Sequence, residues 1–540
     1  MPSATVIVGV AVLTAVVGWQ LQLIGDYRVD DAYISFAFAK NLAAGHGLTY
    51  GADLHVEGYS NFLWTLLAGL VQLVAPNGIY PGMRVLAFAC LGLTLFYTFR
   101  LSARFTGRRW AWLPPIVLVF ATDLTGAAQS ALETIPYTAA LVVTVYYYLT
   151  EKRAKRRISG WCFLLLALVR IDGIVHVAFF LGFTGLAWLV ERRRPRTLET
   201  LRWLLPPSLA YLAYFAWRYN YYGLPLPTTY YAKSLIHVLM PNRGAEYVSA
   251  AVNQLGLYLV GAFALFGVVR RPSRERLLLA LLVVYHAVYI SYVGGDWMPF
   301  HRFLVPVLPF LAVLFSWGAF EAWKLSLRTN WAVRFAVGLG VLASAGYVAN
   351  LQDAHSIDTP EEAVERDMRV HVTKHTRGLL DARGLYRWLI RAPGEKLVTD
   401  YGGVFAYYTD AAIIEMWGLC NAEIALRGNA EGINPIYGKT CIDCYREFQP
   451  DYFHTNVPLL RRISDFNTQS QVISAIFQAQ AIGRVLDFNH DYVTGRVVDR
   501  ANDAAFYFLE RKRPGVSFVT RSPAPGIVVE YPFLEQGREL

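Results

Sequence analysis

Two adjacent carboxylates, Asp30 and Asp31, follow the first apolar segment of the chain and belong to the polar stretch 26–64. Ionisable groups at a membrane boundary are costly, which favours a functional role for them. Aspartate is also a favoured N-cap residue, and a helix is expected to begin at Ala32. Because consecutive helical residues point about 100° apart, one carboxylate can cap that helix while the other faces a cavity. We expect one of them to act as a general base and favour Asp31, which shares a stripe with Ser35.

A second stretch, 294–302 (GGDWMPFHR), lies between two apolar segments and combines a carboxylate with two potential cations, His301 and Arg302. Arginine binds phosphate through a planar fork that lysine does not reproduce. The structural alternative is that Arg302 reaches lipid headgroups and His301 packs. Lys233, near the end of 218–234, is a third candidate for binding an anion. Acids that activate a hydroxyl and bases that hold a phosphate together predict a transfer reaction on a phosphate ester.

Other polar and aromatic residues in the same group of loops are candidates for substrate binding. Glu133 has an equally good structural interpretation, because an acid near a helix start complements the helix dipole. The candidate set is Glu57, Tyr59, Asn61, Glu133, Tyr231, Asp296 and Trp297.

The composition indicates a polytopic membrane protein. The 540 residues are 55% hydrophobic and contain many apolar runs of near membrane-spanning length. The net charge of +10 does not predict nucleic-acid binding, because the basic residues form short clusters between apolar segments. Residues 4–24 lack the basic start and the cleavage site of a signal peptide, so we expect a retained helix.

The basic clusters predict the topology. They begin at Arg100, Lys152, Arg192, Arg270 and Lys324, and the positive-inside rule places all five in the cytoplasm. This requires that 61–75 does not cross, so we expect a re-entrant or interfacial helix with Trp64 at headgroup level. The N-terminus is then inside and the C-terminus outside. About eleven spans are expected: 4–24, 82–101, 110–126, 134–150, 158–170, 173–191, 202–219, 251–269, 277–293, 303–320 and 333–350.

Between the fifth and sixth of these segments, Arg170 and Asp172 are expected to form a structural ion pair. From about residue 351 the composition changes, and strand-like alternation mixes with helical stretches such as 360–392. This predicts a membrane domain over 1–350, with short juxtamembrane helices within 30–75, and a soluble α+β domain over 351–540. The soluble domain is expected on the same side as Asp30 and Asp31.

The five cysteines are scattered, and only Cys441 and Cys444 are close together. No second pair completes a zinc site. In an oxidising compartment a disulfide is expected instead, with Cys420 as one possible partner.

Four stretches carry a resemblance to a known family: VDDAYISFAFAKNLAAGHGLTY, VEGYSNFLWTLL, YYAKS and GGDWMPFHRFLVP. They resemble bacterial GT-C glycosyltransferases of the arabinofuranosyltransferase type, and the resemblance continues weakly into VTDYGGVFAYYTDAAIIEMWGL. It implies a GT-C-like membrane domain, an acidic base in the first external loop at Asp30 or Asp31, and a polyprenyl-phosphate sugar donor. The flanks of the aspartate pair differ from those of mycobacterial members, which leaves the sugar and the acceptor open.

The resulting expectation is an enzyme in the bacterial inner membrane that works on its periplasmic face. It transfers a sugar, with arabinofuranose favoured, from the lipid donor to a cell-envelope glycan or protein. The expected phosphate ligands are Arg302, His301 and Lys233. No cofactor is expected, since the phosphate is already activated, although two adjacent carboxylates can hold a divalent ion. The bilayer is an expected partner and nucleic acid is not.

Three alternatives remain open. Another lipid-linked sugar, such as mannose or aminoarabinose, is transferred to protein or lipid A. The chain is a non-enzymatic assembly or motility factor, although a scaffold does not need Asp30, Asp31 and Arg302 together. A transporter is the weakest alternative, because it favours ionisable residues deep within the spans.

Overall fold

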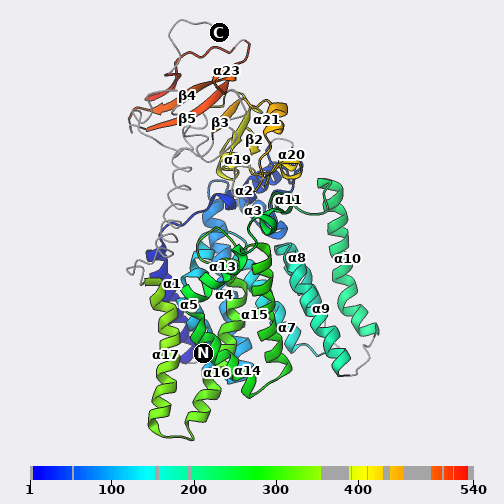
Figure 1. The fold of residues 1–540 in the computed structure, drawn as a ribbon, viewed down its shortest axis with the longest axis vertical. Coiled ribbons are helices and arrows are strands. Elements are labelled where there is room, and N and C mark those ends of the chain that lie inside the picture. The colour runs from blue at the N-terminus through cyan, green and yellow to red at the C-terminus, as the bar shows by residue number, and fades with distance from the viewer. Residues whose placement is uncertain are drawn as a thin grey trace.

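The molecule consists of an elongated bundle of helices with a β-sheet domain at one end (Figure 1). The computed structural model describes residues 4–51, 54–152, 157–191, 197–353, 388–390, 392–409, 411–429, 438–454, 488–501, 504–514 and 516–532. The predicted order, apolar helices followed by a sheet domain, is confirmed. The predicted helical stretch 360–392 lies almost wholly outside the described residues, and the domain boundary near residue 350 stays a prediction.

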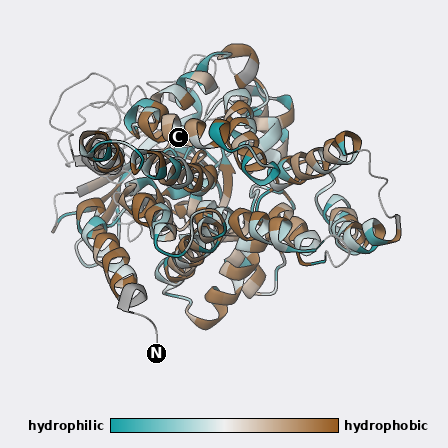
Figure 2. Cartoon of the chain, turned by 90° about the horizontal axis from the view of Figure 1, so that it is seen from below, coloured by the Kyte–Doolittle hydropathy of each residue, from teal (hydrophilic) through white to brown (hydrophobic). Residues whose placement is uncertain are grey.

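Helices occupy all eleven ranges that were predicted to span the membrane. Nine of these ranges hold one main helix each: α1 (Ala4–Ile24), α4 (Ile79–Thr106), α7 (Thr134–Thr150), α8 (Ile158–Val169), α9 (Gly173–Val190), α10 (Thr197–Tyr222), α15 (Arg274–Val293), α16 (Leu308–Ser326, preceded by the 3₁₀ turn η3, Val305–Val307) and α17 (Trp331–Asp353). Viewed from below, these helices carry mostly hydrophobic residues (Figure 2).

Two of the predicted spans are broken rather than straight. The helical segment Trp110–Phe120, which ends in α5 (Leu113–Phe120), is bent by 60° from α6 (Thr122–Gln129). The break lies at Ala121, whose backbone is extended. Helix α13 (Arg243–Gln254) meets α14 (Leu257–Arg270) at 90°, across the left-handed Gly256. By length and composition, four helices of the described chain can cross a membrane, or six if each bent pair counts as one. The count of about eleven therefore stays a prediction.

The two short helices before α4 lie against each other and not along the bundle axis. Helix α2 (Asp30–Ala43) packs against α3 (Phe62–Val74), whose 13 residues are too few for a span. Trp64 does not face the surroundings of the protein, and its expected depth at headgroup level stays a prediction. The indole is buried and donates a hydrogen bond to the Ala131 carbonyl at 3.0 Å, because α3 is packed within the protein at this residue.

Basic residues from three of the predicted clusters meet at one end of the bundle. Arg104 pairs with Glu275 at 2.9 Å, and Arg271 lies 3.5 Å from Glu321, which also lies 3.9 Å from Lys324. These contacts join the ends of α4, α14, α15 and α16. These members of three clusters therefore lie on one side of the bundle, and the orientation of that side stays a prediction.

The C-terminal domain is built on a mixed seven-stranded sheet in the order β2-β1-β3-β5-β4-β7-β6. Strands β1, β2 and β3 pair in parallel, and the remaining pairs are antiparallel. Strand β5 is buried on both faces through Phe506 to Leu509. The bounds are β1 (Lys396–Thr399), β2 (Ala412–Glu415), β3 (Tyr452–His454), β4 (Tyr492–Asp499), β5 (Ala504–Arg511), β6 (Arg521–Ala524) and β7 (Ile527–Glu530).

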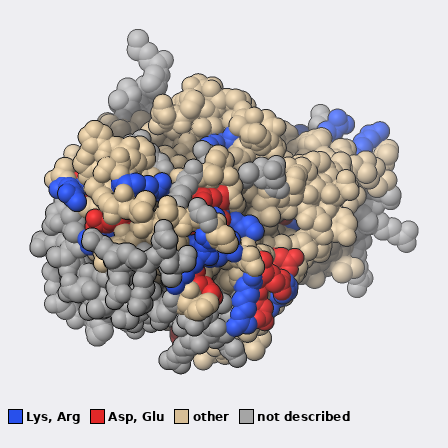
Figure 3. All heavy atoms as spheres, turned by 90° about the horizontal axis from the view of Figure 1, so that it is seen from above, with Lys and Arg blue, Asp and Glu red and all other residues tan. Residues whose placement is uncertain are grey.

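Short helices of the sheet domain contact the membrane domain near the predicted site. Helix α19 (Val404–Tyr408) packs against α2, and α20 (Ala422–Arg427) packs against α11 (Thr228–Ala232) (Figure 1). Seen from above, the surface at this end carries acidic and basic side chains intermixed (Figure 3). The sheet domain thus lies directly on α2, which carries Asp31, and on α11, which ends just before Lys233.

The expected disulfide is present between Cys441 and Cys444, at the start of α21 (Ile442–Phe448). Cys420 is a free, buried thiol, so its expected part in a disulfide is wrong. Cys441 and Cys444 are three residues apart at a helix start, which brings their Cα atoms to 5.2 Å, within the usual range for a disulfide.

Candidate active site

The two adjacent aspartates point to different parts of the molecule. Helix α2 begins at Asp30 itself, and neither carboxylate caps it. Instead the Asp30 carboxylate accepts hydrogen bonds from the backbone N–H groups of Gly403 and Val404, at 3.0 and 2.7 Å. Burial raises the pKa of Asp30 to about 7, although these two hydrogen bonds favour the charged form. The predicted capping of the aspartates' own helix is therefore wrong, since Asp30 binds the start of α19 instead, and the catalytic role of either aspartate stays a prediction.

Asp31 faces a cluster of charges drawn from three other parts of the chain. Arg302 and Lys233 attract its carboxylate, while Asp296 and Glu133 repel it. Burial is the largest influence and raises the pKa of Asp31, and the two cations oppose that shift. These five residues are referred to below as the Asp31 cluster. Helix α2 supplies the acid, and Lys233 follows α11 directly.

Arg302 enters the cluster with its side chain already fixed. Its guanidinium forms an ion pair with Asp296, and its Nη2 lies 3.3 Å from the second carboxylate oxygen. The backbone N–H of Trp297 also donates to Asp296, at 2.9 Å. The Arg302 side chain is only 11% exposed and is already ordered. Binding of a ligand to it would therefore cost little side-chain entropy.

The loop that carries Arg302 has an unusual backbone. Gly294 and Gly295 have φ of 89° and 68°, and the non-glycine residues Phe300 and His301 have φ of 70° and 35°. Left-handed non-glycine residues cost free energy and persist only where the surroundings hold them. Arg243 supplies part of that hold, since it donates to the carbonyls of Gly294 and Asp296.

His301, which was predicted to bind the donor phosphate, is paired with a carboxylate. Its Nδ1 lies 2.9 Å from a carboxylate oxygen of Asp123 on α6, and both side chains are buried. The bend between α5 and α6 brings Asp123 to this position. The structure therefore groups Arg302 and Lys233 around Asp31 and places His301 in a separate pair.

Glu133 connects the Asp31 cluster to a buried network that includes Asn61. Asn61 donates to Glu133 at 2.7 Å and accepts from Ser35 at 3.1 Å. The other oxygen of Glu133 lies 3.1 Å from Arg170, which is also paired with Asp172 at 2.7 Å. The predicted Arg170–Asp172 ion pair is thus confirmed. Glu133 is the residue before α7, but its carboxylate does not cap that helix.

The remaining candidates for substrate binding have structural partners of their own. Glu57 receives a two-pronged ion pair from Arg218, with contacts of 2.6 to 2.8 Å, and both are buried. Tyr59 shares a hydrogen bond of 2.9 Å with Tyr222. Tyr231 and Trp297 are half-buried. Nothing in these contacts links Glu57 or Tyr59 to Asp31, so their role in binding substrate stays a prediction.

Several residues near the cluster were not predicted from the sequence. Arg243 donates to the Asp296 carbonyl at 2.9 Å, and Asp123 contacts His301. Lys40 of α2 donates to the Tyr407 carbonyl of α19 at 3.0 Å. Position just outside an apolar run was the only signal that the sequence offered for Arg243.

No family model matches the chain. It is 25% identical over 342 residues to a terminal β-(1→2)-arabinofuranosyltransferase from Corynebacterium glutamicum, which covers 54% of this chain and 48% of that relative. The chain thus spans about half the length of the curated relative that it matches. The resemblance to the arabinofuranosyltransferase type is confirmed at that level.

Two solved structures share the architecture. ArnT from Cupriavidus metallidurans bound to undecaprenyl phosphate has a TM-score of 0.50 at 14% identity, over 84% of this chain and 94% of that one. The archaeal oligosaccharyltransferase AglB from Archaeoglobus fulgidus, in complex with an inhibitory peptide and a dolichol-phosphate, has a TM-score of 0.54 at 12% identity. It covers 94% of this chain and 75% of that one. Both are GT-C glycosyltransferases. The chain has the GT-C fold. Several of its described helices are long and apolar enough to cross a membrane, while the orientation of the termini stays a prediction.

Proposed function

We propose that the chain is a GT-C glycosyltransferase that moves a sugar, arabinofuranose, from a polyprenyl-phosphate donor to a cell-envelope glycan or protein. The observation that carries the proposal is the position of Asp31. Its carboxylate lies among charges that include Lys233 and Arg302, and within the described chain no hydrogen bond occupies it. A free carboxylate beside two cations provides both the base and the phosphate ligands that the reaction needs.

The proposed reaction is a single displacement. Asp31 accepts the proton of the acceptor hydroxyl as the hydroxyl oxygen bonds to the anomeric carbon. The bond from that carbon to the phosphate oxygen breaks, and its electron pair leaves with the polyprenyl phosphate. Attack from the opposite side inverts the anomeric centre, by the geometry known from inverting glycosidases.

Arg302 and Lys233 serve the leaving group in this proposal. Negative charge grows on the phosphate as the bond breaks, so fixed cations favour the transition state over the ground state. Arg302 is held by Asp296 and Lys233 is partly buried, so neither has to be ordered during the reaction. No nucleotide or metal is proposed, because the phosphate ester is already an activated leaving group.

The similar proteins support the choice of donor. Arabinofuranose is taken from the name of the Corynebacterium relative. The lipid phosphates present in the ArnT and AglB structures support a polyprenyl phosphate carrier. The peptide bound to AglB keeps a protein acceptor beside a glycan acceptor. We place the reaction on the periplasmic face, which the basic clusters at the opposite end of the bundle support.

A transfer assay tests the proposal. The purified full chain in lipid nanodiscs is given polyprenyl-phosphate arabinofuranose, mannose or aminoarabinose, together with envelope glycan, pilin or flagellin, or lipid A. The expected result is transfer of arabinofuranose with release of polyprenyl phosphate. Transfer of mannose or aminoarabinose alone would replace the sugar in the proposal. Failure with every donor, in a protein that still binds undecaprenyl phosphate, would favour the non-enzymatic alternative.

A further inference from the structure

A chain of buried polar side chains runs through three helices towards the Arg302 loop. The hydroxyl of Tyr137 on α7 lies 2.7 Å from Nδ1 of His176 on α9. Nε2 of His176 lies 3.1 Å from Nδ1 of His286 on α15, and Nε2 of His286 lies 2.6 Å from the carbonyl oxygen of Phe303. All three side chains are at most 3% exposed. Such groups are costly to bury in a membrane protein unless each is hydrogen-bonded.

The carbonyl oxygen of Phe303 fixes the direction of every hydrogen bond in this series of side chains. A carbonyl oxygen only accepts, so Nε2 of His286 must carry a proton. A neutral His286 then accepts at Nδ1, and His176 must donate from Nε2. His176 in turn accepts at Nδ1 from the Tyr137 hydroxyl. His176 therefore selects the tautomer of His286 that can hold Phe303.

Phe303 is the residue that follows Arg302, and it is held on three sides. His286 binds its carbonyl, and its N–H donates to the Tyr247 hydroxyl at 3.3 Å. Its ring centroid lies 5.2 Å from the guanidinium carbon of Arg302 and 5.2 Å from that of Arg170. Both peptide units that flank Phe303 are therefore held, and the first of them joins Phe303 to Arg302. Arg302 itself follows two left-handed residues and has no regular helix to fix it.

We propose that His286, with its tautomer set by His176, is a positioning residue that holds Arg302 in place for the donor phosphate. The role rests on the proposed function, because it requires that Arg302 bind phosphate. It goes beyond satisfying buried polar groups, since the histidine pair ends on the peptide next to the phosphate ligand. An anionic lipid phosphate is the ligand whose binding would report the position of Arg302.

The test uses matched substitutions at His286 in the full chain. Glutamine places an amide N–H where Nε2 stands and retains the bond to Phe303, whereas phenylalanine fills the volume without a donor. We measure the Kd of undecaprenyl phosphate in nanodiscs, with undecaprenol as the probe that lacks the phosphate. His286→Phe should raise the Kd for undecaprenyl phosphate about tenfold, as expected for a buried hydrogen bond worth about 1.4 kcal/mol. His286→Gln should stay within about twofold of the parent, and undecaprenol binding should not change.

A double-mutant cycle separates positioning from general damage. If His286 acts through Arg302, His286→Phe should not weaken phosphate binding further in an Arg302→Gln background. His454→Phe is the matched control, since His454 is also buried, donates from Nδ1 to the Tyr507 carbonyl at 2.9 Å, and lies in the sheet domain. It should lower stability without changing the Kd. If His286→Phe does not fold, His176→Phe, with His176→Gln as its rescue, takes its place in the cycle.

The outcomes distinguish the phosphate-binding role of Arg302 from the positioning role of His286. Parent-like binding by Arg302→Gln would overturn the phosphate role of Arg302, and the positioning role with it. Weakened binding by Arg302→Gln together with parent-like binding by His286→Phe would overturn the positioning role alone. Equal losses from His286→Phe in both backgrounds, or a loss for undecaprenol as well, would overturn it too, because the effect would then not pass through Arg302.

Discussion

Asp30 and Asp31 are neighbours in sequence with separate surroundings. Asp30 is hydrogen-bonded to the backbone at the start of α19, whereas Asp31 is influenced by Lys233 and Arg302. A carboxylate held by two amide hydrogen bonds is poorly placed to accept a further proton donor. The structure therefore favours Asp31 as the base.

Arg302→Lys tests the planar fork. Lysine keeps the charge but loses the geometry that grips both Asp296 and a phosphate, so turnover at limiting donor should fall about tenfold or more. Transfer rates and thermal unfolding are measured together. Arg427→Lys is the control, because Arg427 makes a two-pronged pair with Glu447 on the surface of the sheet domain. Unchanged turnover in Arg302→Lys would leave Arg302 as a structural ion-pair partner only.

Lys233→Met tests the charge that acts on Asp31. A base must be ionised, so kcat/KM is lost as the pH falls through its pKa. Lys233 lowers the pKa of Asp31, and its removal should therefore move the acid limb of the profile to higher pH. Profiles are recorded from about pH 4 to about pH 8, which brackets the range between an ordinary and a raised aspartate pKa. Lys396→Met, at the exposed start of β1, should leave the limb in place. An unmoved limb in Lys233→Met would show that Lys233 does not act on Asp31.

At this scale the sequence identified the charged residues but not their partners. Asp31, Lys233 and Arg302 were identifiable because charges at the ends of apolar segments are costly. The pairing of His301 with Asp123, 178 residues away, depends on a bend that no local pattern encodes. The same is true of His176 and His286, which read as isolated histidines in apolar helices.

At the scale of elements, apolar length predicted where helices lie but not where they break. Ranges 110–126 and 251–269 read as continuous apolar segments, although Ala121 and Gly256 bend them by 60° and 90°. Small residues permit such breaks without requiring them, so tertiary packing decides. The sheet domain was predictable from alternation, while its contact with α2 was not.

Gly403→Ala tests the contact between α19 and α2. A Cβ at Gly403 would lie 2.0 Å from the Asp30 carbonyl oxygen, so the two elements must move apart. We expect a loss of about 1–3 kcal/mol in stability, seen as a lower unfolding temperature, as is usual for overpacking a close contact. Gly182→Ala in α9 is the control, because its Cβ would meet nothing within 4 Å. Equal unfolding temperatures for both variants would contradict this account of the contact.

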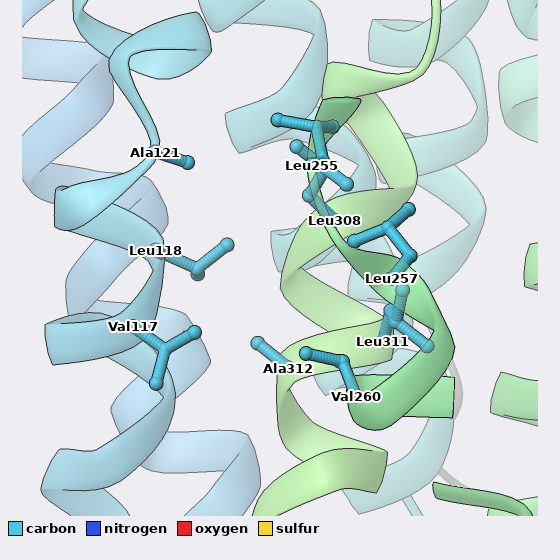
Figure 4. Close-up of a pocket in the computed structure, with 9 residues that line it drawn as sticks. All are labelled: Val117, Leu118, Ala121, Leu255, Leu257, Val260, Leu308, Leu311 and Ala312. Atoms are coloured by element: carbon cyan, nitrogen blue, oxygen red, sulfur yellow. The ribbon is translucent and has the colours of Figure 1, made fainter. Parts of the chain in front are cut away.

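At the scale of the whole molecule, charge separates the two ends of the bundle. Ion pairs among the described basic clusters gather at one end, and the sheet domain and the Asp31 cluster lie at the other (Figure 1). The space between α5, α14 and α16 holds a cavity of about 30 Å³ lined only by apolar side chains (Figure 4). The lining of this cavity offers no group for acid–base chemistry.

Reporter fusions test the orientation. A reporter after Leu540 should be active outside the cytoplasm, and one near Arg156 should be active inside, because the positive-inside rule places the basic clusters in the cytoplasm. Both positions lie outside the described residues, so the fusions do not disturb the contacts discussed above. Cytoplasmic activity of the fusion after Leu540 would mean that 61–75 crosses the membrane and would place the Asp31 cluster on the wrong side.

The most direct test of the central claim compares Asp31→Asn with Asp30→Asn. Asparagine is nearly isosteric and removes the base, so Asp31→Asn should lower sugar transfer by about 10² to 10⁴ while undecaprenyl phosphate still binds. Asp30→Asn keeps one of the two oxygens that accept from the α19 amides, so it should lower stability but retain most of the turnover. Transfer at the parent rate by Asp31→Asn, or a loss confined to Asp30→Asn, would contradict the assignment of Asp31 as the base.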